Sequence, residues 1–149
     1  MKVGVLFAAR IGNPGELLAD ARAVEAAGAD SVWLQDEPNG IDPLIVLAAI
    51  AAVTNELRLG LLTEHQRDSD DGRKRRLDTL EQLSRGRLVP ARERWRQVEV
   101  PADLEAWRRV LAAVDDDDGV IVPHDPRLLD MLRNADETVD RSDLQLALG

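Results

Sequence analysis

The chain has 149 residues and a net charge of −9, with 44% hydrophobic and 32% charged residues. This balance is typical of a folded globular chain, and we expect a single α/β domain that buries a sizeable core. The negative charge argues against a nucleic-acid partner or an anionic membrane surface, because both need clustered positive charge. The sequence contains no cysteine, so it offers neither disulfides nor thiolate metal sites.

The N-terminal residues enter a strand directly. Residues 3–8 are apolar on both faces, and no long apolar segment precedes them. We therefore expect neither a signal peptide nor a membrane span, and a cytoplasmic protein. Asn13 and Pro14 fit the N-cap and first position of a helix over residues 15–27, and Gly28 suits its C-terminal end.

The stretch from residue 29 to residue 60 organises the chain. Residues 31–35 form a short apolar run, as in a parallel strand that is covered on both faces. Asp42 offers an N-cap oxygen, and residues 44–53 predict an almost entirely apolar helix. Residues 57–62 follow as the next strand. A strand, a helix and a strand with short connections predict a right-handed parallel crossover.

The second half continues the alternation of strands and helices. A basic run at residues 73–76 leads into a helix, and we expect it either to pair with Asp68, Asp70 and Asp71 or to form an oligomer contact. Further strands are expected at residues 87–89, 98–100, 119–122 and 144–148, and further helices at residues 102–114 and 127–132. Alternating strands and helices predict a parallel sheet with helices outside.

Ligands of such sheets gather at the carboxyl ends of the strands. Asp36 and Glu37 follow one strand end and either handle protons as a close carboxylate pair or form a solvated loop. His65 follows the next strand. It either shuttles protons there or is an exposed loop residue. His124 follows a later strand and precedes a helix N-terminus, which suits an anion.

Arg10 follows the first strand and is placed either to bind a phosphate or carboxylate or to form a surface ion pair. The two histidines and the nearby carboxylates match no standard metal-ligand spacing, so no metal is expected. The sequence also lacks a P-loop and the glycine-rich dinucleotide fingerprint.

Several segments together resemble a known family. They are GADSVWLQD at residues 28–36, LAAIAAVT at 47–54, LRLG at 57–60 and TLEQLSRGRL at 79–88. In this order and spacing they resemble the bacterial luciferase-like monooxygenase family. That family has a (β/α)8 barrel and uses FMN or a deazaflavin coenzyme. A full barrel needs about 250 residues, so the resemblance implies a truncated or compact TIM-barrel-like fold with parallel strands.

The resemblance also implies a site. Phe7, Ala8, Asp36 and Thr63 would line the ring of an FMN or deazaflavin cofactor, and Arg10 and His124 would also contact it. Glu37 or His65 would handle protons, and the cofactor would transfer a hydride or support monooxygenation of a small-molecule substrate.

A second hypothesis is a catalytically degenerate barrel remnant that serves as a binding or assembly module. The short chain motivates it, as does Pro90, which stands where the family has a glycine-rich strand end. Both hypotheses leave strand edges or an apolar face to be covered, so we expect a homodimer, formed through the apolar helix at residues 44–53. The alternative is a compact barrel that closes without a partner.

Overall fold

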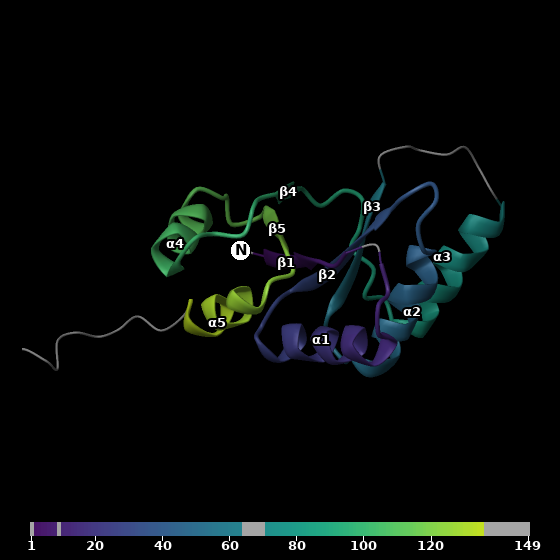
Figure 1. Ribbon diagram of the computed structural model, residues 1–149. Helices are drawn as coiled ribbons and strands as arrows, with labels where there is room; N and C mark the ends of the chain where they lie inside the picture. The colour runs from purple at the N-terminus through teal and green to yellow at the C-terminus, as the bar shows by residue number, and fades with distance from the viewer. Residues whose placement is uncertain (1, 9, 64–70, 136–149) are drawn as a thin grey trace, which may run out of the picture.

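The computed structural model describes residues 2–8, 10–63 and 71–135. Within these residues, parallel strands and helices alternate along the chain, as the sequence predicts (Figure 1). The strands are β1 (Lys2–Leu6), β2 (Ser31–Asp36), β3 (Arg58–Thr63), β4 (Trp95–Gln97) and β5 (Gly119–Pro123). The helices are α1 (Pro14–Ala26), α2 (Pro43–Val53), α3 (Asp71–Leu83), α4 (Leu104–Ala112) and α5 (Pro126–Asn134).

The five described strands form one parallel sheet in the order β3-β2-β1-β5-β4. The sheet curls into a half-barrel, and the fold is a compact, truncated TIM-barrel-like α/β structure with its helices on the convex side. The expected fold class is therefore confirmed. No helix among the described residues is long and apolar enough to cross a membrane.

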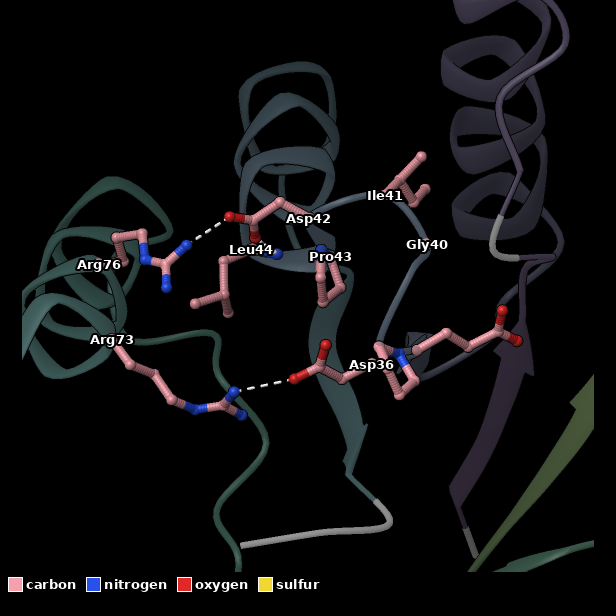
Figure 2. A pocket seen from close by; sticks show the side chains of 10 residues that line it. Asp36, Gly40, Ile41, Asp42, Pro43, Leu44, Arg73 and Arg76 are labelled. Carbon is pink, nitrogen blue, oxygen red and sulfur yellow. Dashed lines mark hydrogen bonds and ion pairs between the residues drawn. The ribbon is translucent and has the colours of Figure 1, made fainter. Parts of the chain in front are cut away.

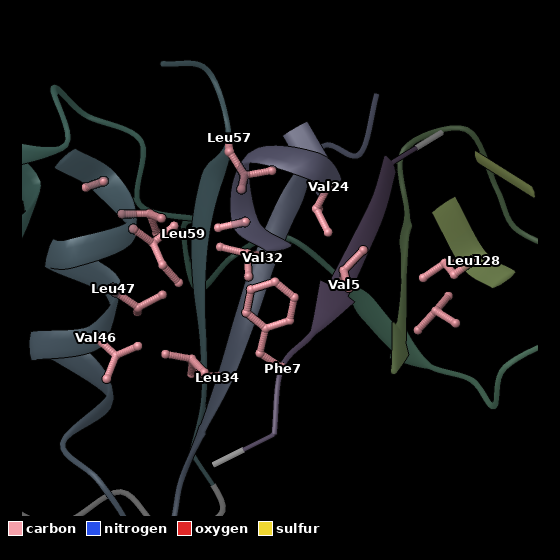
Figure 3. Close-up of a cluster of buried hydrophobic side chains, with 14 of the residues drawn as sticks. Val5, Phe7, Val24, Val32, Leu34, Val46, Leu47, Leu57, Leu59 and Leu128 are labelled. Atoms are coloured by element: carbon pink, nitrogen blue, oxygen red, sulfur yellow. The ribbon is translucent and has the colours of Figure 1, made fainter. Parts of the chain in front are cut away.

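The core lies between the convex face of the sheet and the helices (Figure 3). Because side chains alternate along a strand, one set from each strand points to this side: Val5, Val32, Leu34, Leu59 and Val122 are almost fully buried. Leu47 of α2 and Leu128 of α5 are fully buried against them. Burial of these aliphatic side chains is the main source of the fold's stability.

The helix caps follow the sequence closely. The side chains of Asn13, Asp42 and Asp125 accept hydrogen bonds from the backbone N–H of Gly15, Leu44 and Arg127. A proline follows each of these capping residues, because its fixed φ suits the first helical turn. These caps hold each helix start close to the carboxyl end of the preceding strand.

A single segment, residues 87–98, pairs with β3 at one edge of the sheet and with β5 towards the other edge. We name it the closing segment. At its start, Leu88 bridges to Leu59 of β3 in parallel, with the Val89 amide donating to the Leu59 carbonyl at 2.9 Å. Further on, Trp95 pairs with Gly119 of β5 as the first residue of β4. The chain therefore crosses from one edge of the half-barrel to the other, near the amino ends of the strands (Figure 1).

The closing segment corrects two sequence expectations. Residues 87–89 form one isolated bridge rather than a strand. No strand forms at residues 98–100, and the strand lies just before them, at Trp95–Gln97. The sequence pattern did not indicate a strand at β4, because only Trp95 packs against the inner face of the sheet. The other two residues of β4 are exposed, so no apolar alternation marks the strand. The strand expected at residues 144–148 lies outside the described residues.

Two tryptophans fill the concave face. The Trp33 ring lies over Gly60 of β3, and the Trp95 ring lies over Gly119 of β5, each so close that a Cβ on the glycine would overlap the indole. The two ring centroids are 5.0 Å apart and the rings are tilted by 58°. In a complete barrel, side chains from the opposite strands fill this space. Here the two indoles take that place.

Candidate functional site

The carboxyl ends of β1, β2 and β5 surround a hollow of about 440 Å³, which we call the mouth of the half-barrel. A volume of several hundred Å³ is in the range of cofactor sites. Its lining is Leu6, Phe7, Ala8, Arg10, Gln35, Glu37, Pro123 and His124. Five of the residues singled out from the sequence therefore come together here: Phe7, Ala8, Arg10, Glu37 and His124.

Phe7 and His124 form one wall of the mouth. Their ring centroids are 4.9 Å apart and the rings meet edge to face. The two strand ends are held together by the His124 amide, which donates to the Leu6 carbonyl at 2.8 Å. Nε2 of His124 is buried and has no hydrogen-bond partner among the described residues. A buried ring nitrogen without a partner is unusual.

Asp36 and Glu37 have different neighbours at the end of β2. Side chains alternate along a strand, so Asp36 turns to the opposite side from Gln35 and Glu37. Asp36 accepts from Nη1 of Arg73 on α3 at 2.8 Å, whereas Glu37 lines the mouth. Both residues also line the second hollow described below, and a proton-handling role for the two carboxylates stays a prediction.

Thr63 is the last residue of β3 and pairs in register with Asp36. It is exposed, and it lines none of the hollows described here. His65 lies outside the described residues, so its place at the mouth stays a prediction. Leu6, Gln35 and Pro123 line the mouth but were not singled out from the sequence. Only their position at strand ends could have indicated them, because their side chains are not typical of a catalytic site.

A second hollow, of about 250 Å³, lies between the β2–α2 loop and α3 (Figure 2). Arg73 reaches Asp36, and Arg76 forms an ion pair with Asp42, the N-cap of α2. The basic run at residues 73–76 was expected to pair with nearby aspartates of its own loop. Arg73 instead pairs with Asp36 at the end of β2, and Arg76 pairs with Asp42 at the start of α2. Both carboxylates are distant from α3 in sequence but lie beside it in the fold. Asp68 and Asp70 lie outside the described residues.

Residues 1–62 match the family model described as luciferase-like monooxygenase. This part of the chain is luciferase-like. The resemblance inferred from the sequence is therefore confirmed for β1 through most of β3, and that luciferase-like part supplies six of the eight residues that line the mouth, from Leu6 to Glu37.

Nine solved chains are similar to this structure. One is a crystal structure of riboflavin lyase (RcaE) with modified FMN and the substrate riboflavin, with a TM-score of 0.49 and 23% sequence identity. The similarity covers 59% of this chain and 28% of that chain. No curated protein matches the sequence.

The segment TLEQLSRGRL, at residues 79–88, lies beyond the luciferase-like part and has a structural role here. The Arg87 guanidinium donates to the carbonyls of Ser84, Leu57 and Ala51, at 2.8 to 2.9 Å. Gly86 has a φ of 77°, which permits the tight turn before Arg87. The segment therefore ties the end of α3 to α2 and to the start of β3, away from the mouth.

Proposed function

We propose that this protein binds a flavin or a deazaflavin at the mouth of the half-barrel and acts as an oxidoreductase. The observation that carries the proposal is the mouth itself, because a hollow of about 440 Å³ at the strand ends is built largely from the luciferase-like part of the chain. When bound, the cofactor supplies hydride transfer or oxygen chemistry, and the protein supplies binding and orientation.

The residues at the mouth fit a flat, mostly apolar ring with polar edges. Ala8 and Pro123 offer exposed apolar surface, and the rings of Phe7 and His124 also line the hollow. Arg10, which is exposed at the rim, is placed to meet an anionic group of the cofactor or of a small-molecule substrate. Asp36 and Thr63 would contact the cofactor only at the outer side of the β2 and β3 ends.

Glu37 is the described residue that we propose as the proton carrier, since its carboxylate lines the mouth from the β2 end. His65 remains a second candidate for this role. Both would act on the substrate or on the cofactor ring, because a general acid or base must lie within hydrogen-bond reach of the proton it moves.

Titration with oxidised FMN and with an oxidised deazaflavin tests the proposal, with quenching of the cofactor fluorescence as the measurement. We expect saturable binding to the full chain, and about tenfold weaker binding to His124→Ala, because an aromatic ring that lines the mouth is lost. Arg133→Ala is the matched control, because that surface residue of α5 lies away from the mouth. If neither cofactor binds in its oxidised or reduced form, the proposal is wrong.

A second candidate function is a binding module without turnover. The closing segment favours it, because residues 87–98 occupy the positions beside β3 and β5 where a full barrel continues its strands. This candidate predicts that Glu37→Ala, Asp36→Ala and His65→Ala leave ligand binding unchanged. Turnover that Glu37→Gln abolishes, with binding retained, would exclude it.

The partner that we propose is a second copy of this chain, docked on the groove between α2 and α3. Ile45 and Leu83 are 66% and 62% exposed, and they flank an apolar hollow of about 270 Å³ that also includes Ala48 and Leu80. Exposed apolar surface of this kind is commonly covered by association. Light scattering at micromolar concentration should give a dimer mass, and Ile45→Glu should give a monomer. A monomer mass for the unmodified chain would refute the dimer.

A further inference from the structure

The direction of the Glu37 side chain depends on the loop that carries it. Glu37 lines both the mouth and the second hollow, so it stands between the two spaces at the end of β2. The residue is exposed, and its carboxylate makes no hydrogen bond or ion pair among the described residues. Because no side-chain partner fixes this carboxylate, only the backbone of the β2–α2 loop can hold it at the mouth.

Two ion pairs from α3 fix this loop at both of its ends (Figure 2). Nη1 of Arg73 donates to Asp36, the residue before Glu37, at 2.8 Å. Arg76 pairs with Asp42, the N-cap of α2. The two arginines are one helical turn apart, so their side chains project from the same face of α3. The side chains of Arg73 and Asp36 are 26% and 30% exposed, so solvent screens their attraction less than that of a fully exposed pair.

A tight turn inside the loop leaves room for the Glu37 side chain. The backbone N–H of Gly40 donates to the Glu37 carbonyl at 3.1 Å, and Pro38 fixes φ at the first central position of this turn. A Cβ at Gly40 would lie 3.1 Å from the Cβ of Glu37 and 3.7 Å from its Oε2. Gly40 does not have a positive φ, so a side chain is disfavoured here for lack of space and not because of backbone conformation. A larger residue at this position must displace Glu37.

We propose that Gly40 and the two arginines of α3 are positioning residues, which hold the Glu37 carboxylate at the mouth. The inference rests on the proposed function, because Glu37 acts there on a ligand bound at the mouth. The arginines act through the loop and need no contact with the ligand, since aspartates at the two ends of the loop already engage their guanidinium groups. The arrangement places a negative charge beside the ligand, and this charge disfavours a more negative form of the ligand.

The test uses whichever of FMN and the deazaflavin binds in the titrations above, and compares its oxidised and chemically reduced forms by calorimetry without oxygen. The ring carries a different charge in the two forms, so the ratio of their dissociation constants reports the charge at the mouth. We expect Glu37→Gln to shift this ratio about fivefold towards the more negative form. Gly40→Ala, which adds no charge, should change the ratio at least about twofold. Gly12→Ala should not, because no atom lies within 4 Å of its Cβ position.

Combined variants show whether the positioning residues act through Glu37. Gly40→Ala and Arg73→Ala should each change the ratio in the otherwise unmodified chain, and much less when Glu37→Gln is already present, because coupled residues are not additive. Arg73→Lys keeps a charged donor for Asp36 and should restore most of the original ratio. Lys74→Ala is the control, because it removes a neighbouring charge that is 80% exposed and pairs with Asp78 instead.

The possible results separate this inference from the proposed function. If Gly40→Ala and Arg73→Ala have the same effect with and without Glu37→Gln, or if Glu37→Gln leaves the ratio unchanged, the positioning role is wrong while binding at the mouth stands. If neither cofactor binds, the proposed function fails and the positioning role fails with it.

Amide hydrogen exchange at Gly40 tests the ion pairs without any ligand, because its N–H closes the turn at Glu37. We expect faster exchange at Gly40 in Arg73→Ala and in Arg76→Gln, which is an independent second variant. Unchanged exchange in both would show that the ion pairs do not fix the loop. Thermal unfolding, measured in parallel, shows that each variant is folded.

Discussion

The indole of Trp33 meets the indole of Trp95 across the concave face of the sheet, with the ring centroids 5.0 Å apart. Trp33 belongs to the luciferase-like part of the chain, and Trp95 belongs to the closing segment. This contact therefore joins the first three strands to the segment that spans both edges. Together the two rings pack on the inside of the half-barrel, over Gly60 and Gly119.

Gly60→Ala tests whether this packing is tight. The added methyl group would overlap the Trp33 ring, so either the ring or β3 must shift. Such overpacking typically costs about 1–3 kcal/mol, and we expect that loss in the free energy of unfolding in urea. Gly12→Ala is the control, because no atom lies within 4 Å of the position of its Cβ. Equal stability of Gly60→Ala and the unmodified protein would show that the indole is loosely held.

Glu93 of the closing segment makes the protein sensitive to acid. It accepts from Arg58 at 2.8 Å and from Lys2 at 3.2 Å, and the hydrogen bond from Arg58 is the main reason that the pKa of Glu93 falls from 4.5 to about 2. Because the pKa is lower in the folded state, Glu93 stabilises the fold above about pH 4.5, and this contribution is lost as the pH falls towards 2.

We therefore expect Glu93→Gln to be about 1–2 kcal/mol less stable than the unmodified protein at pH 7, a modest value because the ion pairs are partly exposed. The difference should shrink through the acid range and vanish near pH 2. Urea unfolding at a series of pH values measures it. Glu105→Gln is the matched control, since its carboxylate is 83% exposed. A stability difference that is independent of pH would contradict this account.

The elements built from local patterns could be predicted from the sequence. Asn13, Asp42 and Asp125 carry their capping role in the few residues around them, so the starts of α1, α2 and α5 follow directly. The buried strands β2 and β5 were likewise visible as short apolar runs between polar turns. These features depend on neighbours along the chain, and no tertiary contact overrides them.

Features that depend on distant pairing could not be predicted in the same way. The closing segment pairs Leu88 with Leu59 and Trp95 with Gly119, and nothing near these residues specifies those partners. Arg73 likewise lies 37 residues from Asp36, and the two meet only because α3 packs beside the end of β2. The site was therefore predicted by its place at the strand ends, while the second hollow with its two arginines was missed.

We expect that lysine cannot replace Arg87 without a loss of stability. Its guanidinium donates to three backbone carbonyls and to Thr54 Oγ1, an arrangement that a single ammonium group cannot reproduce. We expect Arg87→Lys to lower the free energy of unfolding by about 2–4 kcal/mol, because partly buried carbonyls lose their donors. Arg85→Lys, at an exposed neighbouring position, should change little. Thermal unfolding distinguishes the two, and similar midpoints for both variants would show that Arg87 is dispensable.

Glu25 of α1 holds the turn between α2 and β3. Its Oε1 accepts from the backbone amides of Asn55, Glu56 and Leu57 at 2.8, 2.7 and 3.0 Å. Burial acts to raise the pKa of Glu25, but these three hydrogen bonds and the nearby Arg87 charge outweigh it and hold the pKa below its usual value. The ionised carboxylate therefore stabilises the turn at neutral pH, and this contribution weakens as acid protonates it.

Glu25→Gln keeps one acceptor oxygen and loses the charge, so we expect a loss of about 1–2 kcal/mol in stability and a local loosening of the turn. Amide hydrogen exchange should accelerate at Asn55, Glu56 and Leu57 before it does in the core strands. Glu56→Gln is the control, because the Glu56 side chain is exposed and only its backbone amide enters the network. Unchanged exchange rates at the three amides in Glu25→Gln would mean that the turn is stable without the carboxylate.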